Sequence, residues 1–205
     1  MDYIFSNKKK NALAACFSLF YLVMLIWKID LGSSPFQSLR YTFHMLYIYT
    51  LPIVTPLLTL VCLLTPLKSP SVKRGLLTVA LGVPVAASFV ALLFMLPNLD
   101  LLIAQPQNHP LLLSSFFMFA STIFMFIGTL VPAKHIKLLK YGALSYAILN
   151  FIRIILDFIA AGGFAYLKAA GAQAVNVILL VQSLCCTLFY LGIFILTTSK
   201  RKHTE

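Results

Sequence analysis

Two opposite charges lie within an otherwise apolar stretch of the chain, residues 141–163. Arg153 and Asp157 are four residues apart near its middle, so on a helix they lie one turn apart on the same face. Tyr146 and Asn150 extend that face at spacings of 4, 3 and 4. A charge at bilayer depth persists only where it is paired, wetted or turned into the protein interior. The pair is therefore either a substrate or proton site in a cavity, or a structural ion pair that fixes the inward face of the helix.

A polar stripe follows one side of the last apolar stretch, residues 172–197. At spacings of 3, 4, 3, 4 and 3, it comprises Gln173, Asn176, Leu180, Ser183, Thr187 and Tyr190. If the two stretches form antiparallel helices joined by a short loop, a rise of about 1.5 Å per residue places Arg153 near the depth of Gln182 and Ser183. The two polar faces then either line one cavity or hold the helices together by hydrogen bonds.

Three prolines fall in the interior of the apolar stretches. Pro52 and Pro56 lie in residues 41–67, and Pro84 lies in the next stretch. Because proline has no N–H, each leaves a carbonyl one turn earlier without its helical partner. Such breaks are either static kinks or the unwound segments at which transporters bind their substrates. We include Thr55, which lies between the first two prolines, among the candidate binding residues.

The sequence contains no motif typical of an enzyme. It has no phosphate-binding glycine loop, no GxSxG sequence and no His–Glu cluster within the apolar stretches. Its four cysteines, Cys16, Cys62, Cys185 and Cys186, form no CxxC pair and fall inside apolar stretches. We therefore predict no enzymatic activity, no metal and no cofactor.

The composition is that of a membrane protein. Of the 205 residues, 60% are hydrophobic and only 10% are charged, against about 25% charged in an ordinary soluble domain. The apolar runs are continuous and do not alternate, which is typical of membrane-spanning helices and excludes a β-barrel. We predict an all-α, polytopic integral membrane protein in which residues 1–205 form one domain within the lipid bilayer.

Six apolar stretches of about 19 to 27 residues are each long enough to cross about 30 Å of hydrocarbon. They comprise residues 11–29, 41–67, 75–96, 111–131, 141–163 and 172–197. The polar segments between them are too short for a separate globular domain. The sequence therefore predicts one bundle of six transmembrane helices.

Basic residues lie almost entirely on one side of this bundle. Four clusters of three fall on the predicted side of both termini: Lys8, Lys9 and Lys10; Lys68, Lys73 and Arg74; Lys134, Lys137 and Lys140; and Lys200, Arg201 and Lys202. Only Lys28, Arg40 and Lys168 fall on the other side. Loops rich in Lys and Arg stay in the cytoplasm, so we predict cytoplasmic termini in a bacterial inner membrane. Because these clusters account for the net charge of +11, we expect no nucleic-acid partner.

Small and soft side chains recur on one face of residues 111–131. At spacings of 4, 3, 4 and 3, they are Ser114, Met118, Ser121, Met125 and Gly128. Such a face lets another helix approach closely. The sequence does not decide whether that helix belongs to the same chain, to a second copy or to a partner membrane protein.

These features most favour a small inner-membrane transport protein or the membrane subunit of a transporter. We expect a polar site between the second, fifth and sixth spans. Its candidate residues are Arg153, Asp157, Asn150, Tyr146, Asn176, Gln182, Ser183, Thr187 and Thr55, with helix breaks at Pro52, Pro56 and Pro84. The alternative is a non-transporting accessory or stress-tolerance protein that acts through a partner, and the third is a membrane enzyme. A water-filled cavity at Arg153 would favour transport, whereas a dry bundle would favour the accessory role.

Overall fold

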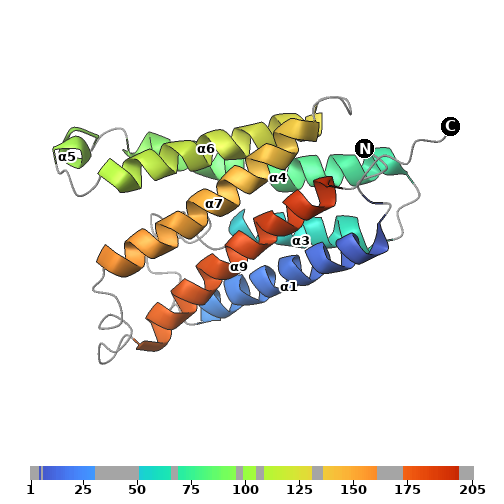
Figure 1. Ribbon diagram of the computed structural model, residues 1–205, viewed down its shortest axis with the longest axis horizontal. Coiled ribbons are helices and arrows are strands. Elements are labelled where there is room, and N and C mark those ends of the chain that lie inside the picture. The colour runs from blue at the N-terminus through green and yellow to red at the C-terminus, as the bar shows by residue number, and fades with distance from the viewer. Residues whose placement is uncertain are drawn as a thin grey trace.

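The computed structural model describes residues 5, 7–30, 51–65, 69–95, 99–104, 109–130, 136–160 and 173–198. Within these residues the chain forms seven helices and no strand (Figure 1). The helices are α1 (Lys8–Asp30), α3 (Leu51–Leu64), α4 (Pro70–Met95), α5 (Leu99–Ile103), α6 (His109–Leu130), α7 (Ile136–Ala160) and α9 (Gln173–Thr197). The predicted all-α fold is confirmed for this part of the chain.

Five of these helices contain segments long and apolar enough to cross a membrane, as a multi-pass membrane protein requires. The segments are Lys8–Ile26, Ser71–Val90, Leu112–Leu130, Ile136–Ile159 and Val177–Thr197. The apolar part of α3, Pro52–Leu64, is shorter. The sequence predicted a span over residues 41–67, of which residues 41–50 lie outside the described part of the chain.

α7 begins earlier than the sequence predicts, and residues 161–163 of the predicted span lie outside the described part of the chain. Expected over residues 141–163, it runs from Ile136 to Ala160 and includes Lys137 and Lys140 in its first turns. Long lysine side chains reach a membrane surface from within a helix, so these charges do not mark its start. The shift moves Arg153 from the middle of the predicted span into the second half of the helix.

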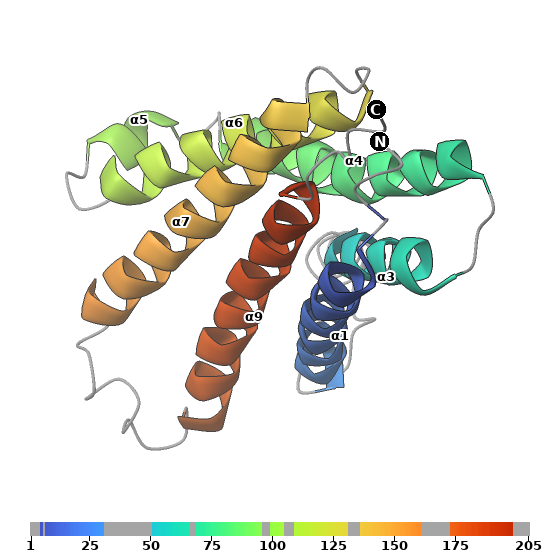
Figure 2. The same cartoon turned by 45° about the vertical axis from the view of Figure 1, so that its right-hand side comes forward.

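The six helices other than α5 form a closed ring in chain order. α1 packs on α3, α3 on α4, α4 on α6, α6 on α7 and α7 on α9, and α9 returns to α1. Successive helices run in opposite directions (Figures 1 and 2). The starts of α1, α4 and α7 and the ends of α3, α6 and α9 therefore gather at one end of the ring. We call this the basic end, and the opposite end the open end.

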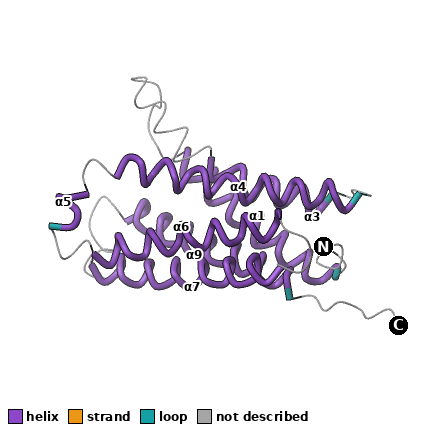
Figure 3. Tube along the Cα trace, turned by 90° about the horizontal axis from the view of Figure 1, so that it is seen from above, coloured by secondary structure: helices purple, strands orange, loops and turns teal. Residues whose placement is uncertain are grey.

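The basic end carries most of the described positive charge. Seven of the eight described lysine and arginine side chains lie there: Lys8, Lys9, Lys10, Lys73, Arg74, Lys137 and Lys140. Lys10 Nζ donates a hydrogen bond to Thr198 Oγ1 at the end of α9, at 2.8 Å. Arg74 Nε donates to the carbonyl of Thr129 at 2.7 Å, and its guanidinium also donates to the carbonyl of Leu130. The two Arg74 bonds satisfy carbonyls at the end of α6, and all three bonds join neighbouring helix ends. Figure 3 shows the ring helices from above, running along the long axis of the molecule between its two ends.

The closest helix crossings also lie near the basic end, and glycines make them possible. A Cβ atom at Gly128 of α6 would lie 2.8 Å from Leu139 Cα of α7. A Cβ atom at Gly142 of α7 would lie 2.9 Å from the Met125 backbone nitrogen of α6. Gly192 of α9 approaches α1 in the same way. Small residues at a membrane-helix crossing let the two backbones come into contact.

Buried side chains fill the ring next to these crossings. All six helices contribute to this core, with residues that include Leu25, Cys62, Leu77, Leu81, Met125, Leu139, Ala143, Phe189 and Ile193. Toward the open end the helices separate: α6 and α7 diverge in Figure 1, and α7 and α9 diverge in Figure 2. The ring is therefore packed at one end and widens at the other.

Candidate functional site

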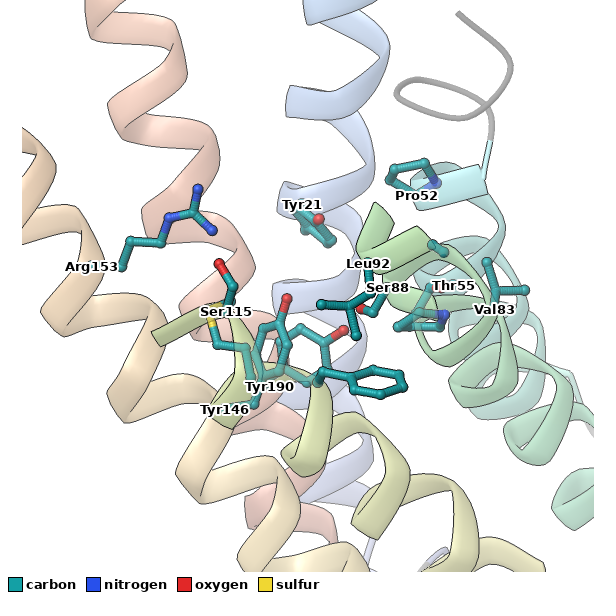
Figure 4. Close-up of a pocket in the computed structure, with 14 residues that line it drawn as sticks. Tyr21, Pro52, Thr55, Val83, Ser88, Leu92, Ser115, Tyr146, Arg153 and Tyr190 are labelled. Carbon is teal, nitrogen blue, oxygen red and sulfur yellow. The ribbon is translucent and has the colours of Figure 1, made fainter. Parts of the chain in front are cut away.

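A cavity of about 380 Å³ lies where the ring widens. All six ring helices line it (Figure 4): Tyr21 of α1; Pro52 and Thr55 of α3; Val83, Pro84, Ala87, Ser88 and Leu92 of α4; Ser115, Met118 and Phe119 of α6; Tyr146 and Arg153 of α7; and Tyr190 of α9. Counted along the helices at about 1.5 Å per residue, Tyr190, Thr55 and Tyr146 lie nearest to the basic end, Leu92 and Ser88 lie farthest from it, and Arg153 comes close behind them. The cavity therefore extends from a floor of tyrosines toward the open end.

Tyr146 and Tyr190 form this floor. Their ring centroids are 4.0 Å apart, and a side-chain hydrogen bond joins them. Their hydroxyl groups point into the cavity (Figure 4). The Tyr190 ring also packs edge-on against the buried Phe189, with centroids 5.0 Å apart, and Phe189 contacts Tyr21 at 5.5 Å. The packed core thus holds three phenol groups in fixed positions at the bottom of the cavity.

Arg153 is the cation of the cavity and lies at its rim. It is two turns above Tyr146 on α7, a distance of about 10 Å along the helix, and its side chain is 39% exposed. Its Nε lies 3.6 Å from Asp157 Oδ2, which is an ion pair but too long for a charge-assisted hydrogen bond. Because the contact is loose and uses one of five N–H donors, the guanidinium keeps donors for a ligand.

Asp157 does not line the cavity. Its side chain is 62% exposed, and it lies three residues before the end of α7. The sequence predicts the pair near the middle of a span, whereas the helix places Asp157 within about 5 Å of its open end. A carboxylate this close to the end of a helix can reach water at the membrane surface. The two charges therefore do not have to be enclosed within the protein.

Thr55 contributes an unused hydroxyl to the cavity. Its side chain is only 3% exposed, and Oγ1 has no hydrogen-bond partner among the described residues. A buried hydroxyl without a partner costs stability, by about 1–3 kcal/mol. Thr59, one turn away on α3, is satisfied in the usual way for a buried threonine in a helix: its Oγ1 donates to the Thr55 carbonyl at 2.8 Å. Among the polar groups that line the cavity, the Thr55 hydroxyl is therefore the clearest candidate to form a hydrogen bond with a ligand.

At the predicted helix breaks, the prolines do not interrupt the described helices. α3 continues through Pro56, and α4 continues through Pro84. Pro52 and Pro84 line the cavity, while Pro56 is buried elsewhere. The prolines therefore shape the wall of the cavity without unwinding the described parts of the two helices.

Asn150 joins α7 to α9 beside the cavity. Its Nδ2 donates to the carbonyl of Ser183 at 3.0 Å and to Thr187 Oγ1 at 2.9 Å. Thr187 Oγ1 in turn donates to the same Ser183 carbonyl at 3.1 Å. These three residues thus form an interhelical hydrogen-bond network, and none of them is among the residues that line the cavity. Of the two interpretations of the polar faces, interhelical bonding applies at this position.

The remaining candidates lie apart from the cavity or outside the described side chains. Gln182 does not line the cavity, although its Oε1 is buried without a partner among the described residues. Asn176 lies in the first turn of α9, where the side chains are outside the described part of the chain. The structure therefore brings Arg153, Tyr146 and Thr55 together in one cavity.

Sequence reasoning missed several polar groups of the cavity. Tyr21 of α1, Ser88 of α4 and Ser115 of α6 line it, and Tyr190 was part of the stripe but not a candidate. Polar residues at helical spacing, such as Thr187 and Tyr190, mark one face of a single helix but do not show which residues of the other helices face it. Only the closure of the ring, which is a long-range feature, brings them together.

The small-residue face of α6 is covered within the chain. Ser114, Met118, Ser121, Met125 and Gly128 are all buried. α7 packs on this face, with Gly142 set against Ser121 and Met125. A second copy or a partner protein would have to displace α7 in order to use it.

The charge of the cavity indicates which ligands it favours. Its described lining has one cation, Arg153, and six hydroxyl-bearing side chains, with no carboxylate and no histidine. Among the described residues, no three His, Cys, Asp or Glu side chains are grouped to hold a metal ion, and the four cysteines are free. Guanidinium and hydroxyl donors suit the oxygens of a carboxylate or phosphate.

Comparison with known proteins adds no family to this description. No protein-family model matches the chain, and no curated protein or solved structure is significantly similar to it. The function must therefore be inferred from the cavity itself.

Proposed function

We propose that the chain is a small inner-membrane transport protein, or the membrane subunit of a transporter, with six spans and both termini in the cytoplasm. Its cavity binds an anionic or zwitterionic solute. One observation carries the proposal: residues from all six ring helices line a single cavity with one guanidinium and six hydroxyls. A pocket with a few convergent polar groups in an apolar wall is the usual form of a small-molecule site.

The distribution of charge supports the orientation. Seven of the eight described basic side chains lie at the basic end, and the rule for membrane loops assigns that end to the cytoplasm. The two described acidic side chains, Asp100 and Asp157, belong to α5 and to the last turn of α7, at the opposite end. With this orientation the cavity opens toward the exterior.

The closed half of the ring supports a transport cycle with alternating access. Between the tyrosine floor and the basic end, the ring is filled by buried residues such as Leu77, Leu139 and Ile193. In this proposal the described arrangement is the outward-open state, and its packed end is the closed cytoplasmic side. Release to the cytoplasm would require α6, α7 and α9 to separate at the glycine crossings, as rocking of one group of helices against another does in transporters.

Access of water to the cavity is the decisive test. Thr55→Cys and Thr59→Cys form a matched pair, because both threonines are buried, at 3% and 1% exposure, and lie one turn apart on α3. Only Thr55 lines the cavity. In a background that lacks the four native cysteines, a charged, membrane-impermeant thiol reagent added to intact cells should modify Thr55→Cys and leave Thr59→Cys unmodified, since a thiol reacts as the thiolate in water.

Ligand protection completes this test. Inorganic phosphate, as a simple anionic probe, should slow the modification of Thr55→Cys, and Arg153→Gln should remove that protection. Equal inertness of the two cysteines would mean a dry bundle and would favour an accessory protein that acts through a partner. Modification only from the cytoplasmic side, in inverted vesicles, would reverse the proposed orientation.

A further inference from the structure

A second, apolar groove adjoins the cavity between α4 and α6. It has a volume of about 200 Å³ and is lined by Phe89, Leu92 and Leu93 of α4, Leu99 of α5, and Leu112, Ser115, Phe116 and Phe119 of α6. Seven of these eight side chains are apolar. Unlike the cavity, the groove therefore offers almost nothing to a hydrated solute.

The groove and the cavity share part of their walls. Leu92, Ser115 and Phe119 line both. These three residues belong to the two helices on either side of the groove, so the groove and the cavity are neighbouring spaces that share a wall between α4 and α6. A ligand that occupied both spaces would pass between these side chains.

The geometry of α4 and α6 explains why the groove lies here. Near the basic end the helices are joined by the bond from Arg74 to Thr129, and a Cβ atom at Gly82 would lie 3.1 Å from the Phe126 ring. Farther from that end, the groove lies between the two helices and is lined by phenylalanine and leucine side chains such as Phe89 and Phe116. The short helix α5 lies across the wide end of this gap, where Leu99 contributes to the groove.

The depth of the groove sets the chemistry of its occupant. Its α6 residues begin at Leu112, the first residue of the apolar segment Leu112–Leu130, and both Phe89 and Phe116 are about half exposed at the outer surface of the ring. In a bilayer that surface faces acyl chains, so the groove opens to hydrocarbon and not to water. An apolar groove that faces hydrocarbon and adjoins a site with one guanidinium and several hydroxyls matches an amphiphile.

We propose that the ligand is a lipid-like amphiphile with an anionic head and an acyl chain. The head binds Arg153 and the hydroxyls of the cavity, the chain lies in the groove between α4 and α6, and the molecule enters sideways from the outer leaflet. This inference rests on the proposed binding function of the cavity and specifies its substrate class. The chain anchors the head near Arg153, which raises the effective concentration of the head at its site.

Two neighbouring leucines on α6 provide a matched test. Leu112 lines the groove, whereas Leu113 is exposed on the outer face and does not. In Leu112→Trp the larger ring fills the groove, and in Leu113→Trp it extends into the lipid. Dissociation constants of the purified, full-length protein in nanodiscs are measured for lysophosphatidic acid, which has head and chain, and for glycerol 3-phosphate, which has the head alone.

The expected dissociation constants distinguish the contribution of the acyl chain from that of the head group. Lysophosphatidic acid should bind at least about tenfold more tightly than glycerol 3-phosphate. Leu112→Trp should remove this advantage and leave glycerol 3-phosphate binding intact, which also shows that the variant is folded. Leu113→Trp should change neither constant, and Arg153→Gln should weaken both.

Other outcomes overturn this inference in distinguishable ways. Equal affinity for the two probes, with no effect of Leu112→Trp, would leave the cavity as a site for a water-soluble anion, so the proposed function would stand without the lipid. Lysophosphatidic acid binding that survives both tryptophan variants equally would be partition into the nanodisc and would also overturn the inference. If neither probe bound and Thr55→Cys were inert, the proposed function would fail together with it.

Discussion

The same six helices form both ends of the ring, but the side chains that lie between the helices differ from one end to the other. At the basic end, Gly128, Gly142 and Gly192 let backbones approach to contact, and buried aliphatic side chains fill the remaining space. At the open end, the facing positions carry bulky or polar residues such as Tyr146 and Arg153, and a cavity remains. The same α7 helix takes part in both, so the difference arises from side-chain size along its length.

This difference assigns separate roles to the two ends. Membrane helices associate through packing and a few hydrogen bonds, because lipid tails solvate an apolar surface as well as another helix does. The basic end therefore supplies most of the stability. The cavity above it retains the Thr55 hydroxyl, which has no partner among the described residues, and the loosely paired Arg153, as a binding site requires. Substitutions at the two ends should consequently affect different measurements.

The largest effect on stability is expected at the α6–α7 crossing. In Gly128→Ala the new Cβ would lie 2.8 Å from Leu139 Cα, and a backbone atom cannot move aside as a side chain does. The forced separation should lower the free energy of unfolding by about 1–3 kcal/mol, measured by titration with SDS. Gly75→Ala is the control, because no atom lies within 4 Å of its Cβ. Equal stability of the two variants would show that the crossing is looser than described.

Much of this fold could be predicted from the sequence. Hydrophobic length identified the helices, and the clustered bases such as Lys73 and Arg74 indicated which helix ends lie together. The closed ring could not be predicted, because apolar faces that pack on helices and apolar faces that meet lipid have the same composition. α4 and α6 illustrate this point, since Phe89 and Phe116 resemble lipid-facing bulk in the sequence but line a groove.

The candidate site could be predicted only in part, for a related reason. Periodicity on a single helix finds polar faces, but the depth count places Arg153 near Ser183, whereas it is Asn150 that donates to the Ser183 carbonyl. Periodicity cannot tell whether two polar faces bind each other or surround a space. Asn150 and Thr187 bond to each other, while Tyr146, on the same face of α7 and one turn away, faces the cavity. The outcome depends on how each side chain is oriented within the closed ring, which the pattern of one helix does not define.

A smaller effect is expected at the junction between the two ends, where Asn150 holds α7 to α9. Asn150→Leu removes the hydrogen bonds to the Ser183 carbonyl and to Thr187 Oγ1. Interhelical hydrogen bonds in membranes contribute about 0.6 kcal/mol each, so stability in the SDS titration should fall by about 1 kcal/mol. Because Asn150 does not line the cavity, the protection of Thr55→Cys by phosphate should persist. Loss of protection with unchanged stability would assign Asn150 to the binding site instead.

The smallest effect on stability is expected at the open end, for the ion pair itself. A buried pair that loses one partner costs about 3–5 kcal/mol, whereas an exposed pair contributes about 1 kcal/mol or less. With side chains 39% and 62% exposed and a separation of 3.6 Å, Arg153 and Asp157 belong to the second class. Asp157→Asn should therefore shift the SDS titration by no more than about 0.5 kcal/mol.

The same substitution should strengthen binding. Removing the carboxylate beside Arg153 leaves the guanidinium without its competing anion, so phosphate should protect Thr55→Cys at a lower concentration in Asp157→Asn than in the parent. Asp100→Asn, at the same end but on α5, is the control for a general change in surface charge and should have no such effect. A loss of several kcal/mol in Asp157→Asn would place the pair in a buried, structural role. Unchanged stability with tighter phosphate binding would instead mean that Arg153 is held at the open end for a ligand and not for the fold.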